Sequence, residues 1–275
     1  MDLTSYLDII RTVSKIYDNS MCMYCGLETP ALGDMAICSN CENIVYMNRS
    51  SLAKREQDLI SKLDSINESI NKSDFHVAIS TYDKIVSERL EPTFLYAEAL
   101  LYIKYSNYEI SQISYDKPGF MDENTKRRDS ATKQASTAKK FLEKAIFMAR
   151  TEIAAGNASL NTVYALFLAQ RKIGNMRGAR EAMELLDRLG KEFITGYVSM
   201  VYETEMKNFD KAIAHAESLV GQNDFSINAF YYIAYALFKK GKRNDAKILL
   251  ETLKPSIASR NVEALINDID SLSTI

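Results

Sequence analysis

The sequence lacks tryptophan, and its 275 residues contain only ten glycines and four prolines. Because glycine and proline end helices and form turns, their scarcity disfavours a fold of many short strands and favours long helices. No run of about 18 consecutive apolar residues is present, so we expect no membrane-spanning helix. Residues 1–19 also lack the basic and apolar regions of a targeting signal, and we expect a cytoplasmic protein.

Strong charge of one sign and the usual catalytic patterns are also absent. The formal net charge is −2, so no overall basic field attracts nucleic acid or an anionic membrane. The two histidines, His76 and His215, lie far apart in the chain, and no HExxH, GxGxxG or phosphate-binding loop occurs. All four cysteines lie in one short segment, which leaves no isolated cysteine as a nucleophile. We therefore expect a protein that is not an enzyme.

What the chain does contain is a pair of CxxC motifs. Cys22 and Cys25 form the first, Cys38 and Cys41 form the second, and twelve residues separate them. Each CxxC turn can aim two thiolates at one point, and Zn2+ accepts four thiolates in a tetrahedron. The spacing therefore predicts a structural zinc site without an open position for catalysis, in a segment that resembles a zinc ribbon. An iron site and a redox-active dithiol pair are the alternatives.

The cysteine segment carries no lysine or arginine between residues 20 and 48. The carboxylates of Glu28, Asp34 and Glu42, together with a zinc ion and four thiolates, would give it a formal charge of −5. Because contacts to phosphates require cations, this surface is a poor one for nucleic acid. Its many apolar residues either pack the ribbon against the flanking helices or form a docking face for another protein.

Apolar residues at helical spacing predict an amphipathic helix within 1–19 and a linking helix within 49–73. The ribbon at 20–48 would then be inserted after the first helix of an all-α fold. From 74 to 275 the pattern becomes pairs of helices, and a small residue recurs on the second helix of successive pairs. The separations are 67 (two periods), 34, 33 and 34 residues for the series Ala78, Ala145, Ala179, Ala212 and Ala246.

The last of these pairs resembles the tetratricopeptide repeat, a family of helical hairpins. The matching positions are Phe230, Ile233, Ala234, Leu237, Gly241, Ala246 and Leu250. The resemblance implies a solenoid in which each hairpin buries its apolar faces against its neighbours. It covers roughly residues 74–255, with an irregular segment at about 106–155 that is either an insertion or an extended hairpin. A cap helix near the C-terminus would close the stack.

In the tetratricopeptide family the first helices of successive hairpins line a concave groove that receives peptides. The resemblance therefore implies a partner-binding groove formed by Tyr164, Leu168, Tyr197, Val201, Asn228, Tyr231 and Tyr235. The full set of lysine, asparagine and arginine with which the family clamps a C-terminal carboxylate is missing. The alternative is that the tyrosines only pack between helices.

These features predict a non-catalytic adaptor or scaffold that binds a peptide or helix of a partner protein. One alternative is a nucleic-acid- or ribosome-associated factor that uses the basic helix at 124–150, with a strip of Arg127, Arg128, Lys139 and Lys140. A solvated helix face is the simpler interpretation of these charges. Another alternative is a self-assembling scaffold, a homo-oligomer joined through the N-terminal helix or through Leu59, Leu63, Ile66 and Ile70.

Overall fold

A computed structural model of the protein describes residues 1–13, 18–25, 28–31, 35–38, 40–46, 54–113, 121–190, 192–220, 227–255 and 260–272. Over these residues the chain is predominantly helical, which confirms the predicted all-α class. The helices are α1 (Leu3–Val13), α2 (Lys54–Asn71), α3 (Phe75–Glu88), α4 (Pro92–Ser111), α5 (Met121–Ala154), α6 (Leu160–Lys172), α7 (Met176–Arg188), α8 (Glu192–Glu205), α9 (Phe209–Val220), α10 (Asn228–Lys239), α11 (Arg243–Leu253) and α12 (Arg260–Ser271). None of these described helices combines the length and apolar character that crossing a bilayer requires.

Four short strands lie between α1 and α2. Strand β1 (Asp18–Met21) pairs antiparallel with β2 (Glu28–Ala31), and β3 (Met35–Ile37) pairs antiparallel with β4 (Ile44–Tyr46). The segment predicted as a ribbon therefore consists of two β-hairpins, placed between two helices as the sequence predicts.

The contacts divide the chain into two compact units, which are described separately. One unit combines Met1–Cys22 and Leu27–Leu52 with Met183–Ile275, and the other combines Met23–Gly26 with Ala53–Ala182. The boundaries expected from the sequence follow the order of the chain. The contacts instead group α1 and most of the ribbon with the C-terminal helices.

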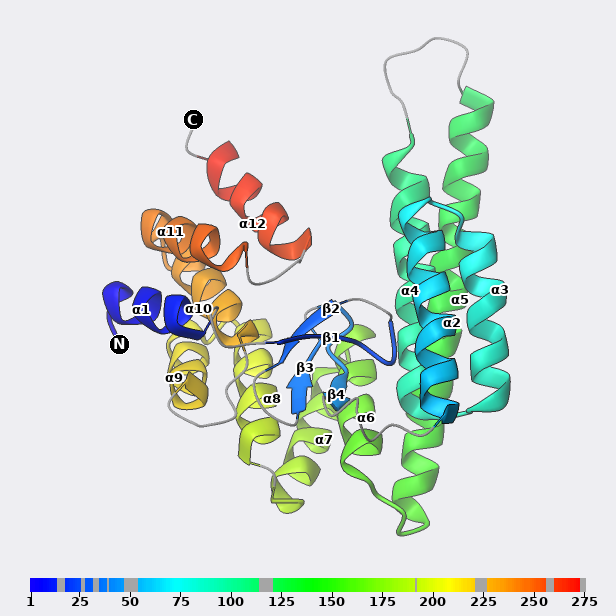
Figure 1. The fold of residues 1–275 in the computed structure, drawn as a ribbon, viewed down its shortest axis with the longest axis horizontal. Helices are drawn as coiled ribbons and strands as arrows, with labels where there is room; N and C mark the ends of the chain where they lie inside the picture. Colours follow the sequence, from blue (N-terminus) through cyan, green and yellow to red (C-terminus); the bar gives the residue numbers. More distant parts are fainter. Residues whose placement is uncertain are drawn as a thin grey trace. The chain divides into compact units, whose positions relative to one another are not determined.

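In the second unit α2 packs on α3, and α4 packs along α5 (Figure 1). The linking helix expected within 49–73 is α2. The irregular segment at 106–155 belongs to an extended helical hairpin, in which α4 has 20 residues and α5 has 34. Between these two helices, residues 114–120 lie outside the described residues, and α5 begins at Met121.

The C-terminal helical hairpins share one type of turn. A residue in the left-handed backbone region follows α6, α8 and α10: Gly174 at φ 79°, Lys207 at φ 62° and Gly241 at φ 83°. The next N–H donates to a carbonyl five residues earlier, which is the hydrogen bond of a Schellman motif. The donor and acceptor pairs are Asn175 and Gln170, Asn208 and Glu203, and Lys242 and Leu237. These turns lie 33 and 34 residues apart, so the predicted period is present in the backbone.

The alanines that set this period are all at most 1% exposed: Ala78, Ala145, Ala179, Ala212 and Ala246. A small side chain at a buried position lets neighbouring helices approach closely. In the first unit consecutive helices pack on one another, α8 on α9, α9 on α10 and α10 on α11. Helix α12 packs on α10 and α11 through the buried Val262, Leu265 and Ile269, in the place expected for a cap helix.

Candidate metal centre

Each CxxC motif occupies the turn of a β-hairpin. Cys22 directly follows β1 and Cys25 lies ahead of β2, while Cys38 directly follows β3 and Cys41 lies ahead of β4. Antiparallel pairing brings the two ends of each turn together. Both cysteines of a motif are therefore presented from the same end of their hairpin.

The second turn is held by two backbone hydrogen bonds. The Cys38 N–H donates to the Asn43 carbonyl and the Glu42 N–H donates to the Cys38 carbonyl, each at 2.9 Å. Glu42 lies in the left-handed region at φ 61°. This conformation costs a residue with a Cβ atom about 1 kcal/mol relative to glycine. Gly26, which follows the first motif and would supply that freedom, lies outside the described residues.

The four sulfurs converge on one point. The Sγ atoms of Cys22, Cys25, Cys38 and Cys41 all lie within 4.8 Å of one another, and those of Cys22 and Cys41 are 3.5 Å apart. Three of the residues are fully buried, Cys25 is half-buried, and no disulfide joins any of the four. A tetrahedral zinc ion with Zn–S bonds of about 2.3 Å needs sulfurs about 3.8 Å apart. The cluster therefore has the size that a metal ion requires.

Two donors beside the cluster favour its thiolate form. The Asn40 N–H lies 3.4 Å from Sγ of Cys38, and Nδ2 of Asn43 lies 3.4 Å from Sγ of Cys41. Hydrogen bonds of this kind stabilise thiolates, the form that binds metal, and orient them. Four sulfur donors fit zinc or iron and leave no coordination position for water or substrate.

Helix α10 holds the second hairpin of the ribbon. Nδ2 of Asn228 donates to the Ile37 carbonyl at 2.9 Å in a buried hydrogen bond, and the Tyr232 hydroxyl donates to Oε1 of Glu42 at 3.0 Å. The Tyr232 ring meets the ring of Tyr197 from α8 edge-on, with centroids 6.0 Å apart. The residues on both sides of the second CxxC motif are therefore bound to α10.

The burial of the predicted groove residues determines which of them a partner protein can contact. Five of them are buried: Tyr164, Leu168, Tyr197, Val201 and Asn228. Tyr231 and Tyr235 are half-buried, and burial followed by the charge of nearby groups raises the pKa of Tyr231 to about 12. Most of the predicted groove thus faces protein, and partner binding there stays a prediction that only Tyr231 and Tyr235 could serve without rearrangement.

Tyr24, which lies between the two cysteines of the first CxxC motif, packs among aromatic residues of its own unit, the second. The Tyr82 hydroxyl, from α3, donates to the Tyr24 carbonyl at 2.8 Å. The Tyr24 ring packs against Phe94 from α4, with ring centroids 5.1 Å apart. All three aromatic residues are buried. They position a residue that lies between the two cysteines of the motif.

Helix α1 packs on α11 in the first unit (Figure 1). The Tyr6 hydroxyl donates to Oε1 of Glu217 at 2.5 Å, and its ring meets Phe230 edge-on with centroids 6.3 Å apart. Burial and the Glu217 carboxylate raise the pKa of Tyr6. The apolar face of this predicted amphipathic helix is therefore covered by the chain itself.

The residues of the two alternative functions are also placed. Arg127 is ion-paired with Glu109 and Glu123, with N–O distances of 3.3 and 3.0 Å, which weakens its attraction for phosphate. The other basic-strip residues are exposed: Arg128, Lys139 and Lys140. The residues considered for self-assembly lie on α2, which packs on α3, and are buried or half-buried: Leu59, Leu63, Ile66 and Ile70. Neither alternative is favoured by these surroundings.

Sequence reasoning missed two features. Glu42 and Tyr232, which join the ribbon to α10, belong to no recognisable motif. Glu98 did leave a signal, because it is the one charged residue in the run from 93 to 103. A single acidic residue in an apolar helical run is either buried with the run or marks a solvent-exposed side of the helix. In the structure Glu98 is buried.

No family model, no curated protein and no solved structure matches this chain. The protein is therefore described by its own fold and site. It is a helical protein with a cluster of four cysteines that could hold a metal ion.

Proposed function

We propose that this protein is a non-catalytic adaptor that binds a peptide or helix of a partner protein, and that a structural zinc ion shapes its N-terminal segment. Stacked helical hairpins present extended surfaces that suit polypeptide partners. A site with four sulfur ligands supplies shape rather than chemistry.

The observation that carries the proposal is the sulfur cluster in a ribbon whose second hairpin is bonded to α10. Helix α10 also carries Tyr231 and Tyr235, the predicted groove residues that keep exposed surface. A metal ion in the ribbon would fix the Ile37 carbonyl and the Glu42 carboxylate, to which α10 is bound. The metal would thereby define the surface beside these tyrosines.

Metal analysis of the purified full chain tests the zinc site. We expect one zinc ion per chain, lost in Cys38→Ser and retained in Ser61→Ala, a control at an exposed serine of α2. Iron at the same stoichiometry would contradict zinc but not a structural metal. A preparation that binds neither metal would contradict the site.

Co-purification from the native cell tests the adaptor. Tyr235→Ala removes a half-buried ring of the predicted groove, and Tyr202→Ala removes a half-buried ring of α8 outside it. We expect recovery of the partner to fall about tenfold or more with the first variant only, which corresponds to the loss of one aromatic anchor. Equal recovery with both variants would contradict binding at this surface.

A further inference from the structure

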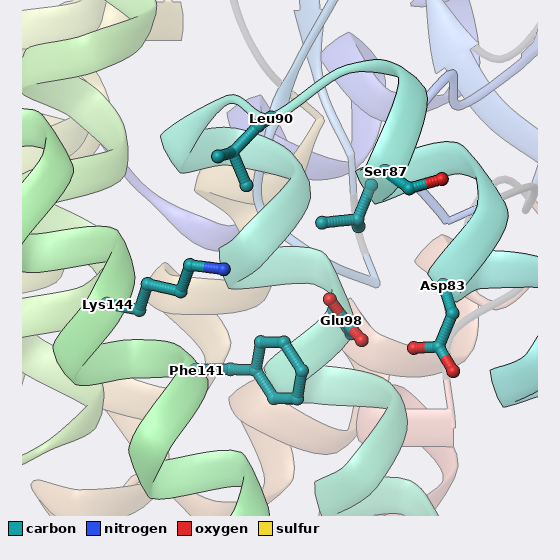
Figure 2. Close-up of a pocket in the computed structure, with 7 residues that line it drawn as sticks. Asp83, Ser87, Leu90, Glu98, Phe141 and Lys144 are labelled. Atoms are coloured by element: carbon teal, nitrogen blue, oxygen red, sulfur yellow. The ribbon is translucent and has the colours of Figure 1, made fainter.

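A pocket of about 310 Å3 lies between α3, α4 and α5 in the second unit (Figure 2). Three of the residues in its wall are apolar and four are charged or polar. The lining residues are Asp83, Val86, Ser87, Leu90, Glu98, Phe141 and Lys144. The proposed adaptor function makes no use of this pocket.

Glu98 is the unusual member of the wall. It is 1% exposed, and in the part of the chain that the structure describes no partner stands at good hydrogen-bond geometry to either of its carboxyl oxygens. Buried polar atoms are almost always hydrogen-bonded, because an unpaired one has lost its hydrogen bonds to water and gained none in the protein. Two orphaned acceptors that line a pocket are therefore an indication of a ligand that brings donors.

Two acids share the pocket with one base. Figure 2 shows the carboxyl ends of Glu98 and Asp83 directed toward a common space, with the Lys144 side chain extending toward it from α5. Burial, then the hydrogen-bonding influence of the Asp83 side chain and the charge of its carboxylate, raise the pKa of Glu98 to about 9, although the charge of Lys144 opposes the rise. Burial and the same two acids raise the pKa of Tyr102, on α4, to about 12. With Glu98 protonated the trio of Asp83, Glu98 and Lys144 is neutral, and with Glu98 ionised it carries one negative charge.

We propose that this pocket binds a primary alkylammonium group, with Glu98 and Asp83 as acceptors and Val86, Leu90 and Phe141 around the carbon chain. An ammonium has three donors and no acceptor, which suits acceptors that lack partners. Its single charge balances the trio once Glu98 ionises. Phe141, which stacks on Tyr102 with ring centroids 5.5 Å apart, adds a fixed aromatic wall of the kind that attracts cations.

The same features disfavour other ligands. A divalent metal ion prefers several oxygen ligands, whereas three of the lining residues are apolar and a fourth is a lysine. An anion would meet two acids and one base. A neutral hydrocarbon would leave both Glu98 oxygens unpaired. The alkylammonium could belong to a free amine or to a lysine side chain of a partner protein, since both present the same group on the same kind of chain.

Binding has a signature that a merely structural Glu98 would not produce. For the ammonium to be held by a carboxylate, Glu98 must release its proton to the buffer. Calorimetry with n-butylammonium near neutral pH, in two buffers of different ionisation heat, measures this release. We expect saturable binding of one ligand per chain, with up to about one proton released.

Glu98→Gln keeps the shape of the side chain but cannot ionise. We expect it to abolish proton release and to weaken binding about tenfold or more. Asp83→Asn, at an exposed position, should weaken binding without abolishing the release. Glu143→Gln alters an exposed carboxylate next to Lys144 that does not line the pocket, and should change neither quantity.

Ligand controls complete the test. Tetramethylammonium has the charge without N–H donors and n-butanol has the chain without the charge, so both should bind more weakly. A lysine peptide that competes with n-butylammonium, when its acetylated form does not, would support a protein source. Competition by free amines alone would support a small-molecule source. Absence of saturable n-butylammonium binding, or equal affinity in wild type and Glu98→Gln, would overturn the proposal.

Discussion

At the scale of single residues, Glu98 makes stability depend on pH. Its pKa is about 9 in the folded protein and 4.5 for an ordinary glutamate. Between these values the folded protein holds a proton that the unfolded chain has lost, so the free energy of unfolding falls as pH rises. We predict that Glu98→Gln removes this slope. Relative to wild type the variant should gain up to about 1.4 kcal/mol per pH unit between about pH 7 and pH 9.

Urea unfolding over that pH range measures the difference, and Glu143→Gln, at an exposed carboxylate, serves as the control that should follow wild type. Parallel curves for wild type and Glu98→Gln would show that Glu98 is ionised in the folded protein.

Glu42 combines an unfavourable backbone conformation with a useful side chain. It lies at φ 61° and accepts a hydrogen bond from Tyr232 at 3.0 Å. Replacement by alanine or glycine removes that hydrogen bond in both variants, but only glycine relieves the backbone. We predict that Glu42→Gly is more stable than Glu42→Ala by about 1 kcal/mol, measured by urea unfolding of the metal-bound protein. Equal stabilities would mean that the turn relaxes around either residue.

At the scale of elements, the turns between paired helices offer a test within one motif. Lys207 occupies at φ 62° the position that Gly174 and Gly241 occupy in the neighbouring hairpins. Lys207→Gly should raise the free energy of unfolding by about 0.5–1 kcal/mol, because glycine adopts this conformation without a steric cost. Gly241→Ala should lower the free energy of unfolding by about 1 kcal/mol. The cause would be backbone strain alone, because an added Cβ meets nothing within 4 Å. Thermal unfolding of both variants checks the opposite signs.

An element could be predicted from the sequence when the interactions that form it join residues close together in the chain. The helices, the periodic alanines and the convergence of the cysteines depend on spacings within a few tens of residues, and such spacings are visible in a sequence. The attachment of Tyr6 to Glu217 and of Asn228 to Ile37 joins residues 211 and 191 positions apart. No local pattern encodes these pairs. For the same reason the 33–34-residue period could assign the tyrosines of the predicted groove to equivalent positions. It could not predict that the second hairpin of the ribbon binds α10.

At the scale of the whole chain, a metal ion bound by the ribbon would connect local metal chemistry with these distant contacts. Structural zinc contributes on the order of 10 kcal/mol in small modules, comparable to the entire stability of a typical domain. The second hairpin has strands of only three residues each, so the pairing of its own strands contributes little stability. Removal of the metal should therefore unfold this hairpin before the helices unfold.

Hydrogen exchange before and after chelation tests that order of events. Because Asn228 and Tyr232 bind groups of the second hairpin, we predict that chelation reduces protection in β3, β4 and the first turns of α10, and leaves α4 and α5 unchanged. Asn228→Ala separates the two causes: with metal bound, it should loosen the start of α10 while the ribbon stays protected. If α10 kept its full protection after chelation, its order would come from the neighbouring helices alone. The surface beside Tyr231 and Tyr235 would then be independent of the metal. That result would contradict the proposal that a zinc ion shapes the partner-binding surface.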